Sequence, residues 1–121
     1  MAQGRDRKGN PLETPIQASI LDNLIHRGVL AWRNQKGIIP IRRGRAIIGQ
    51  RKSDPRTNGM PDIIAVIGGR FIGIEVKSAK GAQDVNQKRW QGDIERAGGV
   101  YILARRWEDV AMMLLEYGIP I

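Results

Sequence analysis

The chain has 121 residues, of which 41% are hydrophobic, and this length fits one domain with its own core. Its 20 Lys and Arg outnumber 12 Asp and Glu, and the formal net charge of +8 indicates attraction to polyanions, most often nucleic acid or an anionic membrane surface. Cysteine is absent and His26 is the one histidine, which excludes thiolate sites, disfavours zinc and leaves oxygen ligands that favour Mg²⁺ or Mn²⁺.

The chain begins with a polar, basic segment. Residues 1–12 are predicted to form a flexible basic tail, which leaves residues 13–121 as a single domain. This beginning resembles neither a signal peptide nor a membrane anchor, and no apolar run approaches the ~20 residues of a membrane span. We therefore expect an intracellular protein that does not enter a membrane.

The first predicted helix starts near Thr14. Thr14 can serve as its N-cap, Pro15 suits the first helical position and Gln17 completes a capping box. Apolar residues then recur at helical spacing until Gly28, a natural stop. Val29–Arg33 is predicted to be a strand.

A basic stretch follows, from Arg33 to Arg56, in which Asp54 is the one acid. Glycine and proline interrupt it, so we predict a loop that contains a short strand around Ala46–Gly49. Such a loop could hold a nucleic-acid backbone, with little sequence preference. Its candidate contact residues are Arg42, Arg43, Arg45, Arg51 and Lys52.

The dipeptide Gly68-Gly69 separates two short apolar runs and is a strong signal for a two-residue hairpin turn. If these glycines form the turn, Ile67 pairs with Arg70, and counting outward places Asp62 opposite Glu75. Directly opposed residues have Cβ atoms roughly 5 Å apart. The predicted strands are Asp62–Ile67 and Arg70–Lys77.

Two carboxylates at such a separation repel each other, and protonation, a cation or a bound metal must relieve the repulsion. Lys77 lies two residues beyond Glu75 and therefore points to the same face. Two acids and a lysine at one end of a hairpin, in a basic protein, suggest metal-dependent chemistry on a phosphate substrate.

The C-terminal part is predicted to contain a helix at Gln83–Ala97, a strand at Val100–Ala104 and a helix at Trp107–Tyr117. The order of elements predicts an α/β domain with a mixed central sheet and flanking helices. Gln87 falls on the inward face of its helix, where its amide needs partners, and the acids of the hairpin could supply them.

Each of these residues also has a structural reading without catalysis. Asp62 could simply begin a strand or pair with Lys77, and Glu75 could lie on a solvated edge strand. Gln87 could reach solvent. Few residues are aromatic, which argues against a stacking platform for single strands, and the three tryptophans are predicted to be core residues: Trp32, Trp90 and Trp107.

Gly59-Met60-Pro61-Asp62, followed by Glu75-Val76-Lys77 and by Gln87 on the next helix, resembles the PD-(D/E)XK nuclease superfamily. Within it, the chain most resembles the VRR-NUC (virus-type replication-repair nuclease) domains, over nearly its whole length. The resemblance implies a restriction-endonuclease-like core for residues 13–121.

The resemblance also implies roles for single residues. Asp62 and Glu75 would bind one or two divalent metals, Mg²⁺ or Mn²⁺, helped by the backbone carbonyl of Val76. Lys77 would position or activate the attacking water. The remaining two matches are Gln87, which would support the metal site, and Glu13, which matches the acid often found at the first helix of these nucleases.

The activity implied by the resemblance is a metal-dependent DNA endonuclease, acting on structured or branched DNA such as four-way (Holliday) junctions in replication, recombination or repair. Small stand-alone members resemble junction-resolving enzymes, which act as homodimers and are typical of phages. A phage-encoded chain would act in the host cytoplasm. The main alternative is a non-catalytic basic nucleic-acid-binding protein, and a role on a membrane surface ranks behind both because the basic residues lie in a glycine-broken stretch.

Overall fold

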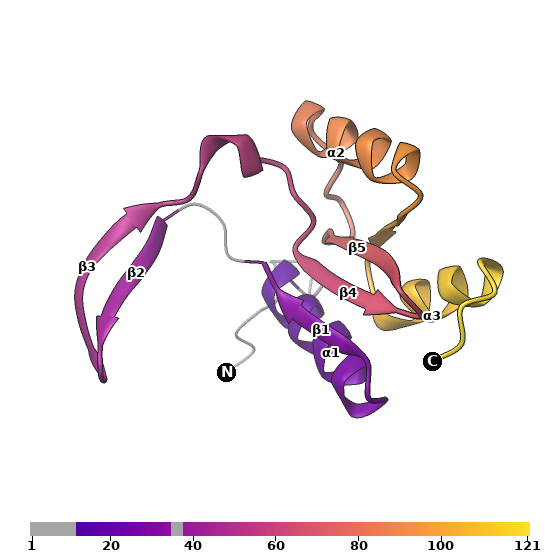
Figure 1. The fold of residues 1–121 in the computed structure, drawn as a ribbon, viewed down its shortest axis with the longest axis horizontal. Coiled ribbons are helices and arrows are strands. Elements are labelled where there is room, and N and C mark those ends of the chain that lie inside the picture. Colours follow the sequence, from indigo (N-terminus) through magenta and orange to yellow (C-terminus); the bar gives the residue numbers. More distant parts are fainter. Residues whose placement is uncertain (1–11, 35–37) are drawn as a thin grey trace.

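The computed structural model describes residues 12–34 and 38–121, so the predicted tail, apart from Leu12, lies outside the described residues. The chain folds into α-helices on both sides of a mixed β-sheet, beside a separate two-stranded ribbon (Figure 1). In chain order the elements are α1 (Glu13–His26), β1 (Leu30–Arg33), β2 (Ile38–Arg43), β3 (Ala46–Lys52), the 3₁₀ turn η1 (Pro55–Thr57), β4 (Ile63–Ile67), β5 (Arg70–Val76), α2 (Val85–Arg96), β6 (Val100–Ala104) and α3 (Trp107–Glu116).

The central sheet has four strands in the order β1-β4-β5-β6. β4 pairs antiparallel with β1 and with β5, whereas β5 and β6 run parallel and are joined through α2. The predicted α/β class with a mixed sheet is therefore confirmed. The predicted strand at Val100–Ala104 has the bounds of β6.

The hairpin register also follows the prediction. Ile67 pairs with Arg70, and the pairs run outward to Ile63 opposite Ile74. Gly68 and Gly69 have φ angles of 58° and 78°, as the two central residues of a type I′ turn require.

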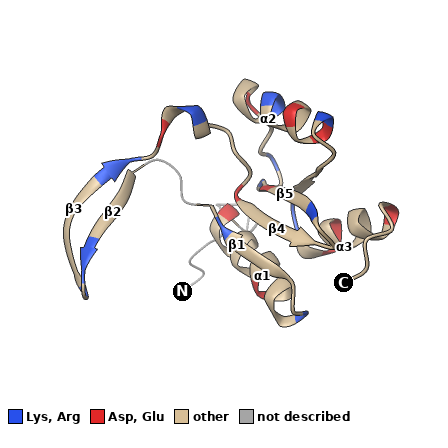
Figure 2. Ribbon diagram, viewed as in Figure 1, with Lys and Arg blue, Asp and Glu red and all other residues tan. Residues whose placement is uncertain are grey.

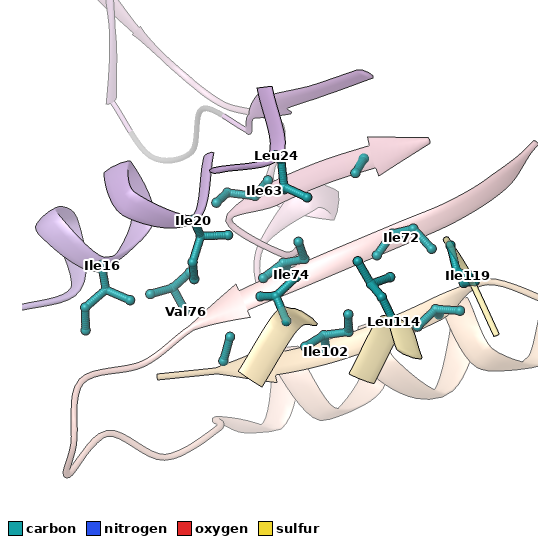
Figure 3. Close-up of a cluster of buried hydrophobic side chains, with 14 residues drawn as sticks. Ile16, Ile20, Leu24, Ile63, Ile72, Ile74, Val76, Ile102, Leu114 and Ile119 are labelled. Carbon is teal, nitrogen blue, oxygen red and sulfur yellow. The ribbon is translucent and has the colours of Figure 1, made fainter. Parts of the chain in front are cut away.

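The hydrophobic core lies between one face of the sheet and the helices α1 and α3 (Figure 3). Alternation places Ile63 and Ala65 of β4 on that face with Ile72, Ile74 and Val76 of β5, and all five side chains are buried. The opposite face of β5 lies against α2, whose Ile94 is buried there. Acids on that second face are thus excluded from the apolar core and lie beneath α2.

Helix α1 begins earlier than predicted, at Glu13 with Leu12 as its N-cap, and no side chain caps it. The predicted capping box of Thr14 and Gln17 is therefore wrong. Both residues lie inside the helix, and Pro15 is accommodated because the amides of a first turn need no helical partner. Among the helices described, none is both long and apolar enough to cross a membrane.

The basic stretch was predicted to be a loop with a short strand around Ala46–Gly49. The short strand falls within β3, but β2 and β3 pair as an antiparallel ribbon, here called the ribbon (residues 38–52), where a loop was expected. Arg43 pairs with Ala46, and Gly44 has a φ of 59°, which suits the first central residue of a type II′ turn. Pro40 is tolerated because a two-stranded ribbon has free edges on both strands. Figure 1 shows the ribbon projecting from the rest of the molecule.

Candidate functional site

Asp62 is fixed by the backbone on both sides of it. Pro61 is fully buried over β5, where a Cβ atom at Gly73 would lie 2.7 Å from the Pro61 Cγ. Asn34, directly after β1, holds the same segment: its backbone N–H donates to the Asp62 carbonyl at 2.8 Å, and its side-chain amide donates to the Pro61 carbonyl at 3.3 Å. Glycine at position 73 therefore makes room for the proline that sets the start of β4.

The segment that leads to Asp62 also touches α2. Gly59 has a φ of 87°, and a Cβ atom there would lie 2.6 Å from the carbonyl carbon of Asn86. One residue earlier, the Asn58 carbonyl accepts a hydrogen bond of 2.9 Å from Trp90 Nε1. These contacts give a structural reason for the Gly59-Met60-Pro61-Asp62 sequence, because glycine permits the close approach to the helix.

Asp62 directly precedes β4 and Glu75 lies in the neighbouring strand β5, and both are buried, with exposed fractions of 8% for Asp62 and 2% for Glu75. Asp62 directly precedes Ile63 and Glu75 directly follows Ile74, so the two acids lie next to the outermost pair of the hairpin. Alternation places both acids on the face opposite the apolar core. Asp62 Oδ2 also accepts a hydrogen bond of 2.8 Å from the Val76 N–H, which ties its carboxylate to the end of β5.

Gln87 reaches the second acid. Its Nε2 donates to Glu75 Oε2 at 3.0 Å, and the side chain is buried, so the reading in which Gln87 reaches solvent is wrong. The Oε1 of the same amide accepts from the Asp84 N–H at 3.0 Å, and Asp84 Oδ1 accepts from the Gln87 N–H at 2.9 Å. This capping box at the start of α2 holds the amide in the orientation that Glu75 needs.

The pKa of Tyr101 in β6 is sensitive to the negative charges on this face. Tyr101 pairs with Gly73 and is buried, and burial raises its pKa to about 12. A hydrogen bond of 2.9 Å from Gln83 to the phenol lowers that pKa, while the charges of Glu75, Asp62 and, more weakly, Asp84 raise it. Because it pairs with Gly73, Tyr101 lies on the same face of the sheet as both acids.

Lys77 follows β5 and continues its alternation, so it lies on the same face as Glu75. The Lys77 N–H donates to the Ala104 carbonyl at 3.0 Å, and its side chain packs on Gly81, where a Cβ atom would lie 3.2 Å from the lysine Cδ. Arg105 holds that loop, because its guanidinium donates to the carbonyls of Ser78 and Gly81, the latter at 2.9 Å. The lysine is thus half-buried and packed against a loop that Arg105 anchors.

Glu13 occupies the first helical position of α1 and is half-buried. Within residues 12–34 and 38–121, no group of three or more His, Cys, Asp or Glu side chains could hold a metal ion. Glu13 therefore does not complete a three-acid group with Asp62 and Glu75 in this structure. Its predicted role as a metal ligand has no support here beyond its position at the start of the first helix.

The predicted nucleic-acid contacts are not gathered around the acids. All five lie exposed on the ribbon, which carries basic residues and no acid and lies to one side of the four-stranded sheet (Figure 2). The structure thus separates the two features that the sequence suggested: a buried acidic pair beneath α2, and the basic residues of the ribbon. The five residues are Arg42, Arg43, Arg45, Arg51 and Lys52.

Sequence reasoning missed several residues around the site. Arg105 and Tyr101 act through partners distant in sequence, so no local pattern marks them. Trp32 was predicted to be a core residue, yet it is 46% exposed. It pairs with Ile64 from the edge strand β1 and so lies on the same face of the sheet as Asp62. Trp90 and Trp107 are half-buried.

Comparison of the chain with models of known protein families gave no match, and no curated protein matches it significantly.

Proposed function

We propose that this protein is a divalent-metal-dependent nuclease that hydrolyses phosphodiester bonds in DNA. The observation that carries the proposal is the pair of buried acids next to the outermost pair of the hairpin, Asp62 and Glu75, on one face of the sheet, with Lys77 beyond them on that same face. Burying two carboxylates side by side costs free energy unless a cation or a proton compensates them. A catalytic metal site explains why the fold keeps them there.

The donors present fit a hard cation. Carboxylate and carbonyl oxygens are the ligands that Mg²⁺ and Mn²⁺ prefer, and Asp62, Glu75 and the Val76 carbonyl would supply them. The Val76 N–H is directed at Asp62, and the N–H and C=O of one strand residue point to the same side. When bound, such an ion lowers the pKa of a water molecule and offsets negative charge on the phosphate.

The neighbouring side chains would prepare the site for the reaction. Lys77 would place an ammonium group beside the scissile phosphate, where it could orient the attacking water and reduce the repulsion between phosphate and acids. Gln87 would keep the Glu75 carboxylate in one orientation through its hydrogen bond. Neither role requires a histidine as general base, and His26, in the last turn of α1, is exposed.

DNA is the proposed substrate because of the net charge of +8 and the basic ribbon. Branched DNA, such as a four-way junction, and action as a homodimer follow from the resemblance to VRR-NUC domains. A symmetric dimer of a chain this small would present two sites and a wide basic surface.

The ribbon by itself favours a second candidate, a basic DNA-binding protein without catalysis. The two candidates differ at the acids, because a binder has no use for Asp62 and Glu75 together. The test is to incubate purified full-length protein with linear duplex and four-way-junction DNA, with Mg²⁺, with Mn²⁺ and with chelator, and to resolve the products on gels.

We expect metal-dependent cleavage, and we expect Asp62→Asn to lower it by at least about 100-fold. Loss of an outer-shell partner of a metal costs up to about 100-fold, and loss of a direct ligand should cost no less. Asp22→Asn makes the same chemical change at an exposed position of α1 and should leave cleavage unchanged. Tight binding with intact DNA under every metal condition would instead support the non-catalytic candidate.

A further inference from the structure

The ribbon carries large apolar side chains that nothing in the described structure covers. Ile38, Ile47 and Ile48 have exposed fractions of 60%, 62% and 57%. A two-stranded hairpin without a packed face is marginally stable in water, and clustered exposed isoleucines mark a surface that another molecule covers. The ribbon therefore needs a partner that accepts apolar side chains.

The isoleucines and the basic residues share the faces of the ribbon. Ile38 pairs with Lys52, and Arg42 pairs with Ile47, so each pair places an apolar and a basic side chain on one face. Between the pairs Ile41↔Gly49 and Arg42↔Ile47, Ile48 is the extra residue of a β-bulge. A bulge bends its strand and increases its twist, which gives the ribbon a curved shape (Figure 1).

Charge selects the kind of partner. Residues 38–52 contain five basic residues and no acid. The ribbon of a second copy would carry the same charge and would repel this one, whereas a nucleic-acid duplex offers phosphates at both edges of a groove. A duplex groove also accepts apolar side chains, which are inserted between base steps by many proteins that bend DNA.

We propose that the ribbon is an arm that binds the minor groove of duplex DNA, with its arginines on the phosphates and its isoleucines against the bases. The proposal rests on the proposed function for its substrate, and it assigns the arm to a duplex segment away from the cut. Insertion of the isoleucines bends the DNA, so the arm selects duplex segments that bend easily.

The experiment measures binding and bending of duplex DNA that carries a donor dye at one end and an acceptor dye at the other. Full-length protein is added in the presence of chelator, so cleavage plays no part. The variant Ile47→Thr/Ile48→Thr removes apolar surface but keeps β-branched residues, and Ile38→Thr tests the same face on the other strand. The matched control is Ile25→Thr, at an exposed position of α1.

We expect the wild-type chain to bring the dyes together, and both ribbon variants to reduce this energy transfer and weaken affinity about tenfold, with Ile25→Thr unchanged. The slope of affinity against salt should stay the same in the isoleucine variants. In Arg42→Ala/Arg43→Ala/Arg45→Ala it should flatten by about 2.7, because each lost phosphate contact removes about 0.9.

Unchanged energy transfer in both isoleucine variants would overturn the proposal. So would sedimentation showing a wild-type dimer that becomes a monomer in Ile47→Thr/Ile48→Thr, because the isoleucines would then cover a second copy. Bending without any metal-dependent cleavage would overturn the proposed nuclease and leave the arm standing. Metal-dependent cleavage by the wild type without bending would overturn the arm and leave the proposed nuclease standing.

Discussion

Gln87 performs two tasks with one amide, since it closes the capping box with Asp84 and donates to Glu75. In Gln87→Ala the buried carboxylate loses this donor, so we expect the free energy of unfolding to fall by about 1–3 kcal/mol. Loss of such a supporting partner should also weaken Mn²⁺ binding by about 10–100-fold. Urea denaturation and isothermal titration measure the two effects.

The matched control for that variant is Gln91→Ala on the same helix. The side-chain amide of Gln91 accepts a hydrogen bond from Gln83, whereas that of Gln87 donates to Glu75. It should lose little Mn²⁺ affinity. Equal Mn²⁺ affinity in Gln87→Ala and the wild type would show that the orientation of Glu75 does not depend on Gln87.

Tyr101 links the acid pair to stability at high pH. Burial, joined by the charges of Glu75 and Asp62, raises its pKa from 10.0 to about 12 against the effect of the Gln83 hydrogen bond. The folded protein therefore holds this proton more tightly than the unfolded chain does. The stability that Tyr101 contributes is fully present below about pH 10 and is lost as the pH rises through about 12.

Removing one of those charges should lower the pKa of Tyr101. We expect Asp62→Asn to shift the titration of this phenol to lower pH, followed through the ultraviolet absorbance of tyrosinate. The measurement is made in a Tyr117→Phe background, which leaves Tyr101 as the one titrating tyrosine. An unshifted titration would mean that the charge of Asp62 does not raise the pKa of Tyr101.

At the scale of elements, the packing of Pro61 on β5 explains the glycine at position 73. In Gly73→Ala the new Cβ would lie 2.7 Å from a rigid proline ring, and we expect a loss of about 1–3 kcal/mol in the free energy of unfolding. Gly49→Ala is the strand control, because its nearest neighbour, Ile41 Cδ1, would lie 3.9 Å away. Urea denaturation that gives equal stabilities for the two variants would rule out this packing constraint.

The loop between β5 and α2 depends on Arg105, which donates to the carbonyls of Ser78 and Gly81. Arg105→Ala removes these hydrogen bonds, and we expect the Gly81 amide to exchange its hydrogen about tenfold faster. Arg106→Ala is the control, because Arg106 forms an ion pair with Asp109 and not with the loop. Exchange at the same rate in both variants would show that the loop holds itself in place.

Turn chemistry decided which elements were predictable from sequence. Gly68-Gly69 fixed the hairpin register, and the alternation of the strands then placed both acids and Lys77 on one face. The same reasoning applied to Gly44-Arg45 predicts the ribbon, whereas the glycines and Pro40 that interrupt the basic stretch favoured a loop. The first helix start was misplaced because Thr14 and Gln17 match a capping box by type, while the backbone begins its helix at Glu13.

At the scale of the whole molecule, the fold divides the sheet into an apolar face and a face that carries the acids. The covering of each face is a tertiary property, and this is why Trp32 was wrongly placed in the core: periodicity identifies a buried side only when something lies on it. The contacts of Arg105 and of Asn34 join segments far apart in sequence and left no local pattern. Action as a homodimer on branched DNA stays a prediction.

Whether Asp62 and Glu75 hold a divalent metal can be measured by a Mn²⁺ titration of the full-length protein, followed by nuclear magnetic resonance. Bound Mn²⁺ broadens the signals of nearby nuclei. We expect the amide signals of Asp62, Val76 and Lys77 to broaden first, and we expect Asp62→Asn to abolish this broadening while Asp22→Asn does not. Broadening centred elsewhere, or unaltered by Asp62→Asn, would contradict the proposed metal site.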